Sequence, residues 1–139
     1  MQQDTVTYQS TVDGIESSQL TGFFVGWPSH PTPAKHLDIL QASHGVELAI
    51  DTSSGQVVGF INVVSDGVFT GYIPLLEVLP EYQGLGIGGK LINRIAERYK
   101  HLYMLDVCCD EDIVPVYRSR GFTQVAGVVR RNYDRQTAE

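Results

Sequence analysis

Cysteine, long apolar runs and excess positive charge are all scarce in this sequence. The 139 residues include two cysteines, Cys108 and Cys109, and neighbouring cysteines cannot easily bridge each other or complete a four-ligand zinc site. We therefore expect reduced thiols and no metal. No apolar run is long enough to cross a bilayer and residues 1–4 are polar, so we expect no membrane partner, no signal peptide and a cytoplasmic location. The net charge of −6 argues against nucleic acid as a partner.

Histidine is also sparse, and the remaining composition is ordinary. His30, His36, His44 and His101 are scattered without a carboxylate or cysteine at metal-ligand spacing, so we interpret them as surface or packing residues. Hydrophobic residues make up 42% of the chain and charged residues 19%, as in soluble globular proteins. A chain of this length has room for one core, which predicts a single domain over residues 1–139.

Apolar periodicity predicts both strands and helices. β-Branched alternation and turn residues predict strands over 5–9, 46–50, 57–64, 68 onward, 102–107, 122–126 and 128–133, the last two as a closing hairpin. Helices are expected over 33–42, with Thr32 as N-cap, and from the glycines to Tyr99. The apolar strand 102–107 should be buried on both faces and parallel to its predecessor. Pro74 predicts an unpaired position or a bulge within its strand.

The chain is organised around residues 75–99, LLEVLPEYQGLGIGGKLINRIAERY, which indicate a strand, a glycine-rich turn and an amphipathic helix. Gly84, Gly86, Gly88 and Gly89 carry no Cβ, so the backbone can turn tightly and bring several N–H groups close to phosphate oxygens. The helix that follows leaves amides unpaired at its N-terminus and adds partial positive charge there. These features predict a pyrophosphate site.

Two kinds of pyrophosphate loop fit these residues. Gly84-x-Gly86-x-x-Gly89 satisfies the dinucleotide fingerprint GxGxxG, with Asp106 at about the distance expected of a ribose-binding acid. In such a turn, however, the strand runs almost directly into the first glycine, whereas residues 80–83 intervene here. This first alternative predicts a nicotinamide dinucleotide as ligand.

The second alternative uses the intervening residues. Gln83-x-x-Gly86-x-Gly88 follows Val78-x-Pro80, and in this the sequence resembles the GNAT superfamily of acetyl-coenzyme A dependent N-acetyltransferases. The resemblance implies an α/β fold with a mixed, mostly antiparallel sheet of about six or seven strands, a splayed parallel pair and flanking helices. It also implies acetyl-CoA as acyl donor and a primary amine of a small molecule or peptide as acceptor. The implied coenzyme-binding residues are Val78, Leu79, Gln83, Gly84, Leu85, Gly86, Ile87, Gly88, Gly89, Lys90 and Tyr117.

A second region extends the resemblance. GNAT proteins commonly show N-x-x-A-x-x-x-Y-x-x-x-GF after the parallel strand, and Tyr117, Gly121 and Phe122 match this pattern. Asp110 and Ile113 depart from it. The match implies that the Tyr117 phenol reaches the coenzyme sulfur and acts as the general acid.

The remaining chemical roles fall on one strand and one aromatic run. Glu77 is the general base that we favour, directly or through a water, with Asp106 in reserve. The resemblance implies that the Val78 N–H donates to the thioester carbonyl. An aromatic run either lines the acceptor pocket or packs in the core; its members are Phe23, Phe24 and Trp27. A catalytically silent coenzyme-binding sensor and a homodimer both remain open.

Overall fold

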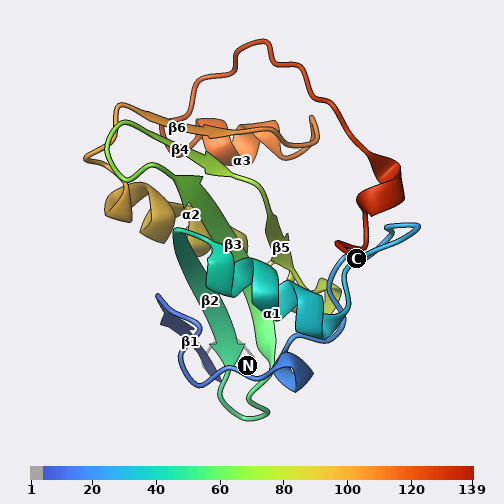
Figure 1. The fold of residues 1–139 in the computed structure, drawn as a ribbon. Coiled ribbons are helices and arrows are strands. Elements are labelled where there is room, and N and C mark those ends of the chain that lie inside the picture. Colours follow the sequence, from blue (N-terminus) through green and yellow to red (C-terminus); the bar gives the residue numbers. More distant parts are fainter. Residues whose placement is uncertain (1–4) are drawn as a thin grey trace.

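A mixed β-sheet lies at the centre of the molecule (Figure 1). The computed structural model describes residues 5–139. Six strands form the sheet: β1 (Val6–Gln9), β2 (Gly45–Asp51), β3 (Val57–Ser65), β4 (Thr70–Ile73), β5 (Leu76–Val78) and β6 (Met104–Val107). Their order is β1-β2-β3-β4-β6, and β5 pairs with β3 as well. All pairs are antiparallel except β4 and β6, which are parallel, so the predicted sheet type is confirmed.

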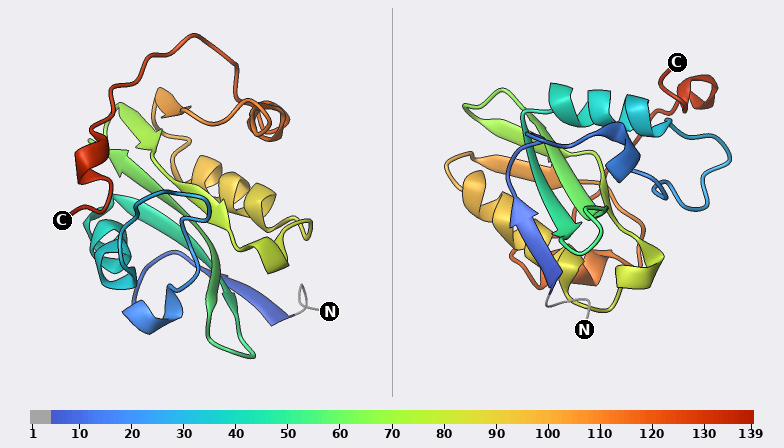
Figure 2. Two further views of the ribbon diagram at one scale, coloured as in Figure 1. Left: turned by 90° about the vertical axis from the view of Figure 1, so that its right-hand side faces the viewer. Right: turned by 90° about the horizontal axis from the view of Figure 1, so that it is seen from below.

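Helices cover both faces of this sheet. α1 (Pro33–Ala42) lies on one face and α2 (Ile87–Arg98) on the other (Figure 2). The shorter elements are η2 (Ser17–Gln19), η3 (Pro80–Tyr82), α3 (Val114–Arg118) and η4 (Tyr133–Arg135). Thr32 caps α1 as predicted, because its Oγ1 accepts a hydrogen bond from Lys35 N at 3.2 Å. The apolar stripe of α2 is buried against the sheet at Ile87, Leu91, Ile92 and Ile95.

The strand that contains Pro74 is broken by a bulge. Val64 pairs with Tyr72 in β4, whereas three residues earlier along β3, Ile61 pairs with Leu76 in β5. Val64 and Ile61 are three positions apart, whereas their partners Tyr72 and Leu76 are four positions apart. The segment that pairs with β3 therefore contains one extra residue, which is a β-bulge. The buried Asn62 side chain fills the break, since its Oδ1 accepts a hydrogen bond from Leu75 N at 3.1 Å. The irregularity predicted at Pro74 is confirmed.

The bulge also separates β5 from β6. The parallel register of β4 and β6 runs from Thr70 opposite Met104 to Ile73 opposite Val107, and there it ends. β5 continues beyond the break with β3 as its neighbour in the sheet. The sheet therefore forks at this point, as expected for a splayed parallel pair.

Two predictions about the C-terminal third are wrong. Residues 122–132 form no strand and no hairpin, and they arch away from the sheet instead (Figures 1 and 2). β6 is parallel to β4 as predicted, but its residues are half-buried or exposed because β6 is the last strand of the sheet. β-Branched residues favour extended backbone without specifying which edge it joins, so the pattern alone could not place this segment. Among residues 5–139, no helix has both the length and the apolar character needed to cross a bilayer.

Candidate active site

The glycine loop that precedes α2 is open. Gly84 and Gly86 adopt φ values of +81° and +83°, which side chains with a Cβ rarely tolerate. A Cβ added to either residue would meet no atom within 4 Å. Gly86 is the N-cap of α2, and no side chain caps this twelve-residue helix. The loop therefore leaves open space at the positive end of a helix dipole, where a diphosphate could bind.

The two glycines that follow have different surroundings. Gly88 lies against β5, since a Cβ there would be 3.7 Å from Val78 Cγ2. Gly89 lies directly against the Arg120 guanidinium, whose Nε donates to Gly89 O at 3.2 Å. Gly89 therefore has a packing role. Because it lacks a Cβ, it leaves room for Arg120, which links α2 to the end of α3.

The main chain of β5 presents hydrogen-bonding groups to the fork. Leu79 N donates to Val58 O at 2.8 Å, and Leu75 O accepts from Asn62 N at 3.3 Å, so these alternate residues face β3. Because successive peptide groups along a strand point to opposite edges, the N–H of Val78 faces away from β3. β6 pairs with β4 but does not continue alongside β5, so this edge of β5 lies at the fork. Val78 N–H is thus aimed into the fork, where the predicted oxyanion donor has to be.

Two side chains anchor the start of the loop. Gln83 Nε2 donates to Val78 O at 3.0 Å, which folds the start of the loop back onto β5. Tyr82 in η3 donates its hydroxyl to Asp51 Oδ2 at 2.6 Å, which ties the loop to the end of β2. Hydrogen bonds from Tyr82 and then Ser53 lower the pKa of Asp51 to about 2. These two contacts hold the start of the loop against β5 and β2.

The same geometry argues against the dinucleotide alternative. β5 is antiparallel to β3, and the η3 turn separates it from Gly84. A dinucleotide-binding turn follows a parallel strand directly. Asp106, the acid assigned to the ribose in that alternative, is exposed on β6 opposite Tyr72 of β4.

Glu77 holds the aromatic segment in place. Its Oε1 accepts a hydrogen bond from Phe24 N at 2.8 Å, and its Oε2 accepts one from Val25 N at 3.2 Å. Phe24 has a φ of +65°, an unusual conformation for a residue with a large side chain. The two charge-assisted hydrogen bonds compensate this strained turn. The carboxylate keeps further lone pairs, and Glu77 also lines the cavity described next.

A cavity of about 340 Å³ lies beside β5, and it contains one of the three predicted acceptor-binding aromatics. Trp27, 39% exposed, is part of its lining. Phe23 and Phe24 are buried, and they pack around the ring of His36, whose two nitrogens have no hydrogen-bond partner among the described residues. Desolvation lowers the pKa of His36 to about 4, so the ring is neutral at physiological pH. The full lining consists of Val25, Trp27, Phe60, Leu75, Leu76, Glu77 and Gln83.

Tyr117 is buried in α3, 3% exposed, and its ring packs edge-on against Phe122 at 5.2 Å. Gly121 turns the chain between them with a φ of +92°, and Phe122 N donates to Tyr117 O at 3.2 Å. Burial, and then the neighbouring Cys109 and Tyr72, raise the pKa of the Tyr117 phenol far above its ordinary value of 10.0. The phenol is therefore protonated at neutral pH.

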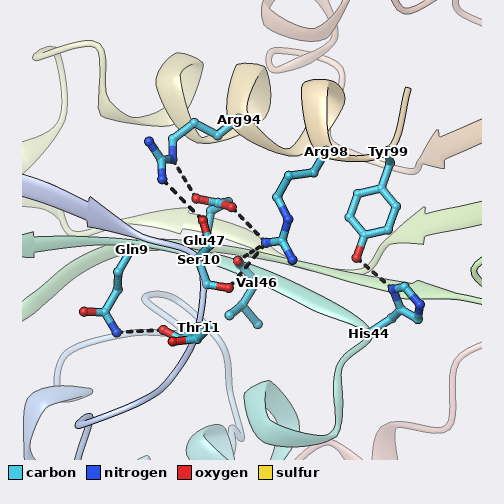
Figure 3. Close-up of polar contacts among 9 residues, drawn as sticks. All are labelled: Gln9, Ser10, Thr11, His44, Val46, Glu47, Arg94, Arg98 and Tyr99. Carbon is cyan, nitrogen blue, oxygen red and sulfur yellow. Dashed lines mark hydrogen bonds and ion pairs between the residues drawn. The ribbon is translucent and has the colours of Figure 1, made fainter. Parts of the chain in front are cut away.

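A second, open groove of about 550 Å³ lies along α2, where residues of this helix and of β2 line it. Glu47 of β2, 1% exposed, is one of its lining residues and pairs with Arg94 at 2.6 Å and with Arg98 at 2.8 Å (Figure 3). Lys90 borders the groove and lies over the Tyr8 ring at 5.0 Å. A single acid within the apolar strand sequence VELAI was the available signal for this buried ion pair.

Comparisons with known proteins agree with this geometry. The model of the Acetyltransferase (GNAT) family matches residues 12–122. "GCN5-related N-acetyltransferase 3, chloroplastic" of Arabidopsis thaliana is 39% identical over 72 residues, 50% of this chain and 30% of the plant protein. The chain thus spans less than a third of that relative's length.

Two solved bacterial structures align over nearly the whole chain. A candidate acetyltransferase from Deinococcus radiodurans R1 superimposes with a TM-score of 0.94 at 39% identity, over 99% of this chain and 95% of that chain. A GNAT family acetyltransferase from Streptococcus pneumoniae TIGR4 gives a TM-score of 0.73 at 27% identity, over 91% of this chain and 98% of that chain.

Proposed function

Because the chain belongs to the acetyltransferase (GNAT) family, we propose that it transfers the acetyl group of acetyl-CoA to a primary amine of a small molecule or peptide by direct attack. One observation carries the proposal: the Val78 N–H faces the fork in the sheet, next to the open loop at Gly84 and Gly86. A donor held there can receive the charge that develops on a thioester oxygen while the loop amides hold a diphosphate.

Each step of the transfer has a group on this chain. The lone pair of the neutral acceptor amine forms a bond to the acetyl carbon, and Glu77 takes the proton that the nitrogen loses as it becomes an amide and passes that proton to solvent. The Val78 N–H hydrogen-bonds the carbonyl oxygen as it gains negative charge. The carbon–sulfur bond then breaks, and Tyr117 gives its proton to the departing thiolate and regains one from solvent. The products are an amide and free coenzyme A.

A silent coenzyme-binding sensor is the second candidate. The observation in its favour is that both carboxylate oxygens of Glu77 already accept main-chain hydrogen bonds, from Phe24 and Val25. In that case Glu77 would be an anchor for the aromatic segment and would remove no proton from an acceptor.

The test measures release of the coenzyme A thiol across a panel of amines and peptides, together with coenzyme binding by calorimetry. We expect turnover with at least one amine; tight coenzyme binding without thiol release from any acceptor would favour the sensor.

Glu77→Gln separates the base from the anchor. We expect its kcat to fall by about 10²–10⁴-fold with loss of the acidic limb of the pH profile, while the coenzyme Kd stays the same. Glu81→Gln is the matched control, because Glu81 is an exposed acid of η3 close to the same loop. A Glu77→Gln variant that keeps the acidic limb and raises only the KM for the amine would assign Glu77 to anchoring.

A further inference from the structure

The cavity beside β5 has the size and lining of a site for a small apolar molecule. Apart from Glu77 and Gln83, its lining residues carry apolar or aromatic side chains. Its volume of about 340 Å³ lies near the lower end of the roughly 300–1,000 Å³ over which protein pockets hold small ligands. A compact ligand with a largely apolar skeleton is therefore the best match for this space.

Trp27 offers an aromatic surface to such a ligand. Its ring packs at 61° to the Phe24 ring with the centroids 4.9 Å apart, and its N donates to Phe24 O at 3.2 Å. Phe24 is buried, whereas Trp27 is 39% exposed. The indole is thus held by a fixed neighbour while part of its surface stays open. Such a surface attracts apolar groups, and its face also attracts ammonium groups.

Glu77 gives the cavity a charge of one sign. It is the acid of the lining, and within residues 5–139 the lining contains no lysine, arginine or histidine. Its two oxygens accept main-chain hydrogen bonds from Phe24 and Val25, which hold the carboxylate in place without neutralising it. An amino group is therefore favoured beside Glu77, whereas a carboxylate or phosphate close to that amino group would be repelled.

The cavity also adjoins the main-chain donor at the fork. Glu77 immediately precedes Val78 in β5. Gln83, the other polar residue of the lining, donates to Val78 O at 3.0 Å. A ligand whose nitrogen lies beside Glu77 is thus one residue away from the Val78 N–H.

We propose that the acceptor is a small primary amine on an apolar carbon skeleton, with no acidic group near the amino group. This inference rests on the proposed acetyl transfer, because it names the substrate class of that same site. The skeleton contacts Trp27 and Phe60, and the amino group lies beside Glu77. Free amino acids are poor acceptors, because the carbon that bears their amino group also bears a carboxylate, which would face Glu77.

Three amines of one skeleton test the charge rule. They are 3-methylbutylamine, leucine, which adds a carboxylate to it, and leucinamide, which adds an uncharged group of the same size. Like charges about 4 Å apart at a protein surface correspond to about a thousand-fold in affinity, and salt screening reduces this. Thiol release should give leucine a kcat/KM about 30- to 1,000-fold below the other two, expressed per concentration of neutral amine. Equal values for leucine and leucinamide overturn the proposal.

Trp27 provides a readout that does not depend on turnover. It is the one tryptophan of the chain, so its fluorescence reports on the cavity. In the presence of coenzyme A, which has no acetyl group to transfer, 3-methylbutylamine and leucinamide should change the emission saturably and leucine should bind about 30- to 1,000-fold more weakly. Saturable binding without acetyl transfer supports this acceptor site and counts against the proposed function. Transfer to amines that leave the emission unchanged overturns the acceptor site and keeps the proposed function.

A charge placed in the lining checks the rule directly. Val25 lines the cavity, is 59% exposed, and holds Glu77 through its main-chain N–H, which a substitution retains. In Val25→Lys, the added positive charge should shrink the ratio of the leucine and leucinamide Kd values by about tenfold or more. The matched control is Val25→Met, which is uncharged and should keep the wild-type ratio. A ratio that is the same in Val25→Lys and Val25→Met also overturns the proposal.

Discussion

The charge-sensitive position of the glycine loop is Gly86, where we predict that Gly86→Asp removes most coenzyme affinity. A carboxylate at this position would project into the open space at the start of α2. Two unit charges about 4 Å apart at a protein surface repel by about 4 kcal/mol, which corresponds to about a thousand-fold in Kd. Salt screening reduces this, so we expect a loss of about 30- to 1,000-fold relative to the uncharged isostere.

The isostere separates charge from backbone strain. Gly86→Asn has the same size as Gly86→Asp and the same burden of a φ of +83°, so its difference from Gly86→Asp isolates the charge. Gly55→Asp, at a φ of +77° in the turn after β2, controls for strain away from the loop. Calorimetric titration with coenzyme A measures each Kd, and the gap between Gly86→Asp and Gly86→Asn should narrow as salt is added. Equal affinities for Gly86→Asp and Gly86→Asn would refute the assignment of a phosphate to this loop.

Two further predictions concern Tyr117 of α3 and Tyr82 of η3. Tyr117→Phe keeps the packing against Phe122 but loses the proton donor, so kcat should fall by about 10²–10⁴-fold with an unchanged coenzyme Kd; stopped-flow thiol release checks this, and wild-type kcat would contradict it. Tyr82→Phe removes the largest contribution to the lowered pKa of Asp51. Because that folded pKa, about 2, lies below the ordinary 3.8, the stabilisation is present above about pH 4 and is lost as pH falls through about 2. Urea unfolding should therefore show Tyr82→Phe less stable than wild type at pH 7 and the difference shrinking toward pH 2; a pH-independent difference would contradict the reasoning.

Local patterns were enough to predict the loop and its helix. The stripe of Ile87, Leu91 and Ile95 fixes which face of α2 is buried, and glycine fixes where the backbone can turn left-handed. Thr32 and Pro33 likewise fix the start of α1. These features depend on neighbours within a few residues, so a sequence contains them directly.

Features that depend on distant partners were not predictable in the same way. The ion pairs of Glu47 with Arg94 and Arg98 span about fifty residues, and only the strand order brings them together. The sequence allowed Phe23 and Phe24 to be either pocket or core residues. Their burial depends on the turn at Phe24 and Val25, whose main-chain N–H groups donate to the distant Glu77. The segment 122–132 has strand composition without a strand partner in its own chain.

The bulge at Pro74 determines how β5 is presented to the candidate active site. Just before β4, the Phe69 C=O faces β6, whereas after the break the Leu75 C=O faces β3. The extra residue therefore reverses the edge of the strand to which alternate peptide groups point. It also shifts the register by one, which sets Glu77 opposite Phe60 on the face that carries the aromatic segment. With the register of β4 continued unbroken, Leu76 would occupy that position and the Val78 N–H would face β3. Pro74 has no N–H to donate to a strand ladder, and the bulge at this residue opens the fork. The same bulge sets the positions of the Glu77 carboxylate and the Val78 N–H.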